Sequence, residues 1–190
     1  MDESMMPMSS EDTKMQTYFR GRVGLHALLK AMGIGPSDQV AIQAFTCIAV
    51  PEAVMATGAS PLYIDIEDDG FNMSADDLAS KVTPQTRAIV VQHTFGIPAD
   101  MECIIKVATA HGIPIIEDCC HTFASKYKGK DVGSFGVGSF YSYEWGKPLV
   151  AGIGGSIRVN DKKLADTIKS DYAQYNLPDI VTQIKIELQY

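Results

Sequence analysis

A lysine and an aspartate are the side chains of this sequence whose surroundings are best suited to chemistry. Lys147 lies between an aromatic run and a glycine cluster in SFYSYEWGKPLVAGIGGS. Its amine could condense with the carbonyl group of a cofactor and later act as a base that moves a proton. Asp118 ends an apolar run, and a carboxylate there is the usual partner of a pyridinium nitrogen. Together they predict pyridoxal 5'-phosphate (PLP) as the cofactor.

Each of these two residues also has an ordinary structural explanation. Most lysines are solvated, and an aspartate at the end of a strand often caps the following turn. The combination favours a site, because Gly146 and Pro148 restrict the backbone around the lysine and Trp145 could shield it.

A candidate phosphate site lies at the start of the first expected helix. Gly21 and Arg22 open that helix, where free main-chain N–H groups and the helix dipole favour an anion and the arginine adds charge. Ser142, just before the lysine loop, could offer its hydroxyl to the same phosphate. Ordinary helix capping and an inert strand serine are the alternatives.

Two histidines are expected at the same edge as Asp118. His121 follows the aspartate by three residues and could pack on the cofactor ring or bind its phenolic oxygen, with a buried core histidine as the alternative. His93 ends another expected strand and could contact substrate, with simple packing as the alternative. His26 and His111 suit solvated or helix-capping roles.

Alternating apolar runs and helical patterns predict an α/β fold. Strands are expected at 39–43, 61–66, 87–92, 113–117, 137–143 and 156–159. Helices are expected at 21–32, 48–57, 75–81, 100–111 and 162–173. Apolar rather than alternating strands indicate a mostly parallel sheet with helices on both faces. Such sheets bind ligands at the carboxyl ends of their strands, where Asp118 would lie.

Composition and charge predict one soluble domain. The 190 residues are 46% hydrophobic and 21% charged, and the net charge of −7 argues against nucleic acid or an anionic membrane as a partner. No run approaches the roughly 20 apolar residues of a membrane span, and the N-terminal residues lack a signal-peptide core. A cytoplasmic location is therefore expected. The four cysteines do not have the spacing of a metal-binding motif, so we expect reduced thiols and no metal site.

The organisation along the chain divides into three segments. We expect residues 1–18 to form a flexible tail and residues 19–175 to form the cofactor-binding domain. Residues 176–190 are expected to begin a linker or helix toward a C-terminal domain that this sequence does not contain.

Five stretches occur in a characteristic order, and the last of them contains the lysine loop. They are GRVGLHALLKAMGIGPSDQV, AFTCIAVPEAVMATGASPLYIDI, TRAIVVQHTFGIPADM, IPIIEDCCHTFASKYKGKDVGSFG and SFYSYEWGKPLVAGIGGS. The order resembles the DegT/DnrJ/EryC1/StrS sugar aminotransferases over about residues 19–161. The resemblance implies the large domain of a fold type I PLP-dependent transferase, transfer of an amino group from glutamate to a keto sugar attached to a nucleotide, and either a homodimer or a second chain that supplies the C-terminal domain.

By position, the resemblance assigns roles to the residues already singled out. It makes Lys147 the attachment lysine, Asp118 the partner of the pyridine nitrogen and Ser142 a phosphate contact. His121 takes the position beside the ring, and Gly21 lies on the phosphate-binding turn.

Three positions depart from the family pattern. Arg22 replaces a hydroxyl residue on the phosphate-binding turn, and Cys47 stands where an aromatic residue commonly stacks on the cofactor. Ile153 stands where the family usually has glutamate. Because of these departures and the missing C-terminal domain, two alternatives remain open: a noncatalytic or regulatory homologue that keeps the fold, and a PLP-dependent sugar dehydratase, in which histidine commonly replaces the lysine.

Overall fold

A seven-stranded sheet forms the centre of the computed structural model, which describes residues 15–172 and 180–181. Its strand order is β1-β9-β8-β5-β4-β2-β3. The strands are β1 (Met15–Tyr18), β2 (Gln39–Gln43), β3 (Ser60–Ile64), β4 (Thr86–Gln92), β5 (Ile115–Asp118), β8 (Gly138–Ser142) and β9 (Gly155–Val159). Strands β3, β2, β4, β5 and β8 are parallel, whereas β9 pairs antiparallel with both β8 and β1. The prediction of a mostly parallel mixed sheet is confirmed.

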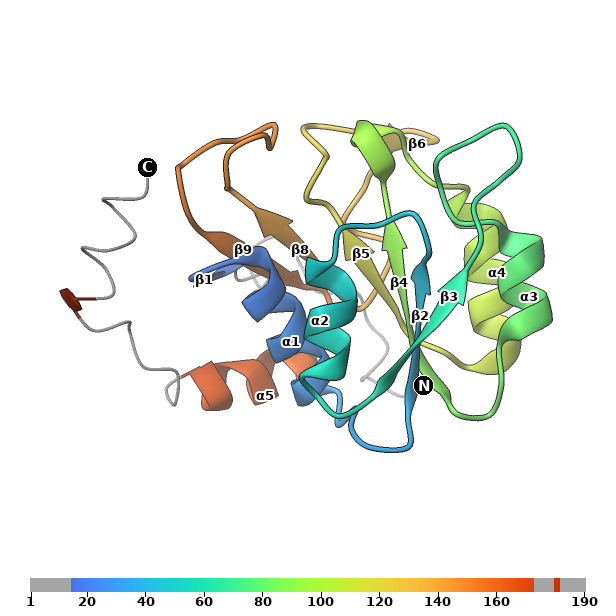
Figure 1. Cartoon of the computed structure of the whole chain (residues 1–190), viewed down its shortest axis with the longest axis horizontal. Coiled ribbons are helices and arrows are strands. Elements are labelled where there is room, and N and C mark those ends of the chain that lie inside the picture. The colour runs from blue at the N-terminus through green and yellow to red at the C-terminus, as the bar shows by residue number, and fades with distance from the viewer. Residues whose placement is uncertain (1–14, 173–179, 182–190) are drawn as a thin grey trace.

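Within the described residues, five helices cover the two faces of this sheet (Figure 1). They are α1 (Gly21–Ala31), α2 (Ala49–Met55), α3 (Ala75–Lys81), α4 (Met101–His111) and α5 (Lys162–Tyr172). Helices α1, α2 and α5 share one hydrophobic cluster with one face of the sheet, and α3 and α4 share a second cluster with the other. Neighbouring residues of β4 divide between the clusters, with Val90 in the first and Val91 in the second, because successive side chains of a strand point to opposite faces.

The helices differ in how they begin. Ser74 caps α3 by accepting the Asp77 N–H at 3.2 Å, and Asp100 caps α4 by accepting the Cys103 N–H at 3.3 Å. In contrast, Arg20 precedes α1 without any side-chain capping hydrogen bond. The first turn of α1 is thus left without a side-chain cap. The Val23 N–H donates to the Arg20 carbonyl at 3.1 Å, so the N–H groups of Gly21 and Arg22 are the ones that could bind a ligand.

The described domain begins earlier than expected. Residues 15–18 were predicted to belong to a flexible tail, but they form β1, and Tyr18 is buried with its ring 5.4 Å from that of Tyr172. The remaining residues of the expected tail, and nearly all of the expected linker, lie outside the described residues. The sequence MQTY is short and largely polar, so no apolar run indicates this edge strand.

The sequence patterns also do not predict a short hairpin and a 3-10 turn. The hairpin of β6 (Lys126–Tyr127) and β7 (Lys130–Asp131) turns through two residues in the left-handed region, and a 3-10 turn, η2 (Thr94–Gly96), follows β4. Within the described ranges, no helix has the length and apolar character that crossing a membrane requires.

Candidate functional site

One pocket at the carboxyl edge of the sheet collects seven of the eight predicted site residues. This edge is the upper one in Figure 1. The predicted residues that line the pocket are Gly21, Arg22, Cys47, Asp118, His121, Ser142 and Lys147. Residues that are far apart in the sequence meet there because the parallel strands deliver their carboxyl ends to one side.

Lys147 extends from the loop between β8 and β9 toward His121. The Lys147 Nζ atom lies 3.1 Å from Nε2 of His121. The main-chain N–H of Lys147 donates to the Glu144 carbonyl at 3.1 Å, which closes a tight turn that includes Gly146 at a φ of 83°. Burial and the Lys147 charge lower the pKa of His121, and Asp118 only partly opposes this shift. The ring is therefore neutral at physiological pH.

Asp118 is held at the end of β5 by main-chain hydrogen bonds. Its side chain belongs to a residue that is only 5% exposed, and Oδ1 accepts the Cys120 N–H at 2.9 Å. Its main-chain carbonyl accepts the His93 N–H at 3.2 Å. The carboxylate thus has a fixed place in the pocket wall, between β4 and β8.

The start of α1 packs directly on the strands beside it. A Cβ atom on Gly21 would lie 2.9 Å from the Tyr141 carbonyl oxygen and 3.1 Å from the Ser142 Cβ. Only glycine therefore permits this approach, which places the uncapped helix start next to Ser142. The arrangement is a cradle for an anion, built from main-chain N–H groups and one hydroxyl.

Gly155→Ala is expected to disturb this cradle. A Cβ at position 155 would lie 2.6 Å from the Cα of Gly21, so helix and strand must separate, at a cost of about 1–3 kcal/mol in the free energy of unfolding. Urea denaturation measures this loss. In the control variant Gly35→Ala the new Cβ meets nothing closer than 3.8 Å, and we expect a change within about 0.5 kcal/mol. Equal stability of the two variants would contradict the close packing.

Arg22 is paired with a carboxylate rather than left free for an anion in this cradle. Its guanidinium forms an ion pair with Glu52 of α2, so the helix start contributes main-chain N–H groups and the arginine's charge is shared. The neighbouring Arg20 pairs with Glu144 of the lysine loop at 3.0 Å. Both members of this second pair line the pocket, and the sequence analysis missed them because no motif connects residues so far apart.

His93 does not lie in the pocket, although the sequence analysis expected it to contact substrate. It is fully buried on the opposite face of the sheet, where Nδ1 accepts the Ala99 N–H at 3.1 Å and Nε2 lies 3.2 Å from Glu117 Oε2. The pocket residue of this strand end is Gln92, which pairs with Asp118 across β4 and β5. The alternation of strand side chains could have indicated this. Gln92 is two residues beyond Val90 and therefore lies on the same face of the sheet, whereas His93 lies on the other.

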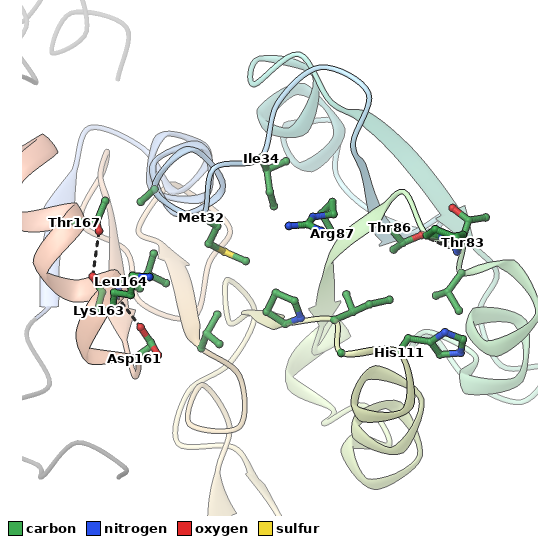
Figure 2. A pocket seen from close by; sticks show the side chains of 17 residues that line it. Met32, Ile34, Thr83, Thr86, Arg87, His111, Asp161, Lys163, Leu164 and Thr167 are labelled. Atoms are coloured by element: carbon green, nitrogen blue, oxygen red, sulfur yellow. Dashed lines mark hydrogen bonds between the residues drawn. The ribbon is translucent and has the colours of Figure 1, made fainter. Parts of the chain in front are cut away.

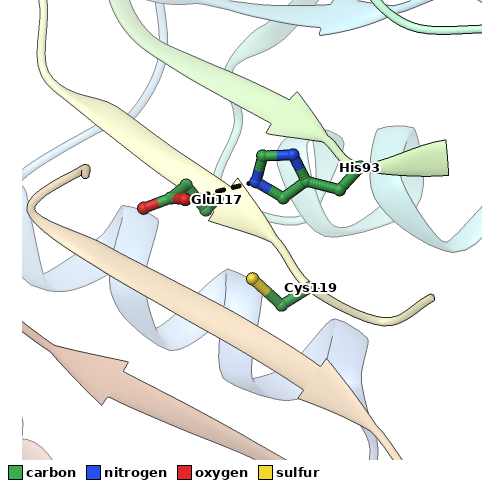
Figure 3. A group of neighbouring side chains, drawn as sticks. All are labelled: His93, Glu117 and Cys119. Carbon is green, nitrogen blue, oxygen red and sulfur yellow. Dashed lines mark hydrogen bonds and ion pairs between the residues drawn. The ribbon is translucent and has the colours of Figure 1, made fainter. Parts of the chain in front are cut away.

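Glu117 is the centre of a buried cluster with His93 and Cys119 (Figure 3). Its carboxylate accepts main-chain N–H groups from Gly133 at 2.6 Å, Phe135 at 2.6 Å and Gly136 at 2.9 Å. Because the Ala99 N–H occupies Nδ1, His93 carries its proton on Nε2 and donates a fourth hydrogen bond. Burial raises the pKa of Glu117, but these hydrogen bonds outweigh it and leave the pKa below its ordinary value. The cluster therefore fixes the segment that leads into β8.

Glu117→Gln should destabilise the fold without touching the pocket. An amide nitrogen would face N–H donors, so buried donors would lose their partner at a cost of about 2–3 kcal/mol. A carboxyl group with a lowered pKa stabilises the folded state at neutral pH and loses this contribution in acid, so stability should also depend less on pH in the variant. Denaturation at pH 7 and at lower pH measures both effects.

The matched control is Glu102→Gln, which removes an exposed ion pair with Lys128. We expect this change to cost less than about 1 kcal/mol. If the two glutamine variants were equally stable, the buried carboxylate would not have the structural role that its four hydrogen bonds indicate.

A larger cavity, of about 780 Å³, opens at the opposite edge of the sheet (Figure 2). Its wall includes Met32, Arg87, His111, Lys163 and Leu164. None of the eight predicted site residues lines it, and it faces the amino ends of the parallel strands. The chemistry-bearing residues thus gather at the smaller pocket.

Comparisons with known proteins show the family of the chain. The model of the DegT/DnrJ/EryC1/StrS aminotransferase family matches residues 17–174. GDP-perosamine synthase of Escherichia coli O157:H7 is 41% identical over 150 residues, which are 79% of this chain and 41% of that protein. The chain therefore spans about two fifths of the length of this curated relative.

Solved structures of aminotransferases are similar to this chain in fold. An aminotransferase from Psychrobacter cryohalolentis matches with a TM-score of 0.79 and 32% identity over 83% of this chain and 40% of its own. The PLP form of a Streptococcus pneumoniae protein matches with a TM-score of 0.75 and 26% identity, covering 83% of this chain and 44% of its own.

Proposed function

Since the chain belongs to the DegT/DnrJ/EryC1/StrS aminotransferase family, we propose that it is the PLP-binding part of an aminotransferase. In the whole protein, an amino group would pass from glutamate to a keto sugar attached to a nucleotide. The observation that carries this proposal is the convergence of Lys147, Asp118 and the uncapped start of α1 on one pocket.

The donor set of the pocket fits PLP. Lys147 offers an amine to the cofactor's carbonyl carbon, and Asp118 offers a buried carboxylate to the ring nitrogen. The cradle between Gly21 and Ser142 suits the phosphate, since a Cβ would fill the space that the glycine leaves. When bound, PLP supplies an electron sink for the negative charge that develops on the substrate carbon.

The side chains of this chain have separate tasks in such a reaction. Lys147 Nζ would hold the cofactor, and its amine could also move a proton at the substrate carbon. Asp118, fixed by the Cys120 N–H, would keep a proton on the ring nitrogen by its negative charge. His121 contacts the lysine at 3.1 Å and would lie beside the ring.

Two of the departures from the family pattern also lie near this pocket. Cys47 lines the pocket and is exposed, so no aromatic ring from this position covers the cofactor. Loss of a stacking ring lowers affinity by about 1 kcal/mol, which weakens PLP binding without abolishing it. Ile153 follows Gly152 in the lysine loop, and Gly152 forms a bridge with Glu144, whose carboxylate pairs with Arg20.

The proposal also extends to the acceptor substrate and to the oligomeric state of the protein. The relative named GDP-perosamine synthase favours a nucleotide-linked sugar as the acceptor. The location that we propose for the enzyme is the cytoplasm. Phe45, Phe71 and Phe95 are 48%, 49% and 62% exposed and contact one another beside the pocket. An exposed aromatic group of this kind supports a homodimer, or a second chain that completes the site.

Trapping the cofactor tests the proposal directly. The chain is incubated with PLP and reduced with borohydride, and the modified peptide is mapped by mass spectrometry. We expect an adduct confined to Lys147. No adduct, or a scatter of adducts over exposed lysines such as Lys128, would contradict the proposed cofactor site.

A further inference from the structure

We propose that the main-chain N–H of Phe95 selects the tautomer of His121, so that the imidazole presents an N–H donor to the amine of Lys147. Phe95 is thereby a positioning residue that acts through its backbone. The consequence for reactivity rests on the proposed function, whereas the tautomer itself does not.

The turn that carries Phe95 is held in an unusual conformation. Phe95 has φ 55° and ψ 22°, in the left-handed region that non-glycine residues adopt only where the surroundings enforce it. Gly96 N–H donates to the His93 carbonyl at 3.2 Å, and Thr94 is buried, with its N–H donating to Asn72 Oδ1 at 2.9 Å.

This conformation aims the Phe95 N–H at the imidazole. The amide nitrogen lies 3.3 Å from His121 Nδ1. The two rings are parallel within 1°, with centroids 6.0 Å apart, so the histidine has its plane fixed as well as its hydrogen bond. Backbone and ring therefore orient His121 together.

A hydrogen bond at Nδ1 determines what Nε2 can do. A neutral imidazole has one lone-pair nitrogen and one N–H nitrogen. Nδ1 must supply the lone pair, because its partner Phe95 is a main-chain donor, and the proton is left on Nε2. The alternative tautomer would set two N–H groups against each other at Nδ1.

The selected proton points at Lys147. Nε2 lies 3.1 Å from the lysine Nζ, and an ammonium group has no lone pair with which to accept it. A lone pair on nitrogen can accept this proton, and the same lone pair makes an amine nucleophilic. Burial, the largest cause, lowers the pKa of His121, which agrees with a neutral ring.

Nitrogen NMR of the chain without PLP tests the tautomer. The His121 signals are assigned by their loss in the variant His121→Gln. We expect a neutral ring at pH 8 that is protonated on Nε2. A neutral ring protonated on Nδ1, or a charged ring protonated on both nitrogens at that pH, would overturn the proposal.

A pair of variants tests the donor role through the rate of PLP capture at Lys147. His121→Phe keeps a planar ring but has no donor, and losing one hydrogen bond of this kind should slow capture at pH 7 by about tenfold. His121→Gln keeps an amide N–H for the lysine and an oxygen for the Phe95 N–H, so it should restore most of the lost rate. Equal rates in the two variants would refute the donor role.

The two measurements also separate this inference from the proposed function. If the unaltered chain formed no adduct at Lys147, the proposed cofactor site would fail, but the NMR spectrum would still decide the tautomer. If the adduct formed and the spectrum showed Nδ1 protonated, the function would stand and the inference would be wrong. Circular dichroism checks that both variants are folded.

Discussion

Lys147→Ala is expected to abolish the covalent capture of PLP and to lower amino transfer by the whole protein by about 10⁴-fold, the upper range for losing a proton-transferring group. The variant lacks both the amine that holds the cofactor and the base that moves the proton. Its fold should remain, because the side chain is only half-buried and bonds to the ring of His121. Borohydride trapping and urea denaturation measure these two expectations.

The control for this prediction is Lys163→Ala. Lys163 is an exposed lysine that lines the cavity at the opposite edge of the sheet, so it removes the same side chain far from the pocket. We expect capture and stability to match those of the unaltered chain. An undiminished adduct in Lys147→Ala would refute the assignment of this lysine, and an equal loss in both variants would show that capture is not specific to the pocket.

Asp118→Asn should leave PLP attached and nearly stop amino transfer, with a loss of about 10²–10³-fold, as expected for removing an electrostatic group from a reaction centre. The amide is nearly isosteric, and its oxygen can still accept the Cys120 N–H. It has no negative charge, so it does not keep a proton on the ring nitrogen. Single-turnover transfer from glutamate and mapping of the adduct separate these effects.

Asp161→Asn is the matched control for the aspartate. Asp161 Oδ1 accepts the Leu164 N–H at 2.7 Å at the start of α5, so this variant also keeps a main-chain hydrogen bond while losing a charge. Transfer should be unchanged there. Transfer at the unaltered rate in Asp118→Asn would exclude the role of this carboxylate, whereas a lost adduct would show that it serves attachment rather than proton retention.

Much of the fold followed from apolar patterns in the sequence. Strand β2 and helix α3 have the predicted bounds, and the other predicted elements differ from theirs by a few residues at most. The unpredicted edge strand is stabilised by non-local contacts. Strand β1 has little apolar character of its own and depends on β9 and Tyr172.

The site was predictable where one segment carries the signal. Lys147 and Asp118 stand in distinctive local surroundings, and both line the pocket. The assignment of His93 failed by one residue, because the end of β4 directs Gln92 to the pocket and the histidine to the opposite face. The pair of Arg20 and Glu144 depends on the path of the whole chain, which local patterns do not contain.

The pairing of β1 with β9 also sets an order for folding. The two glycines that let α1 approach the sheet, Gly21 and Gly155, come from opposite ends of the described chain. Closing so long a loop is entropically costly and makes such contacts late and slow. During synthesis the parallel strands can associate first, and the anion cradle forms only after β9 has left the ribosome. The cofactor's phosphate would therefore be recognised by one of the last parts of the domain to assemble.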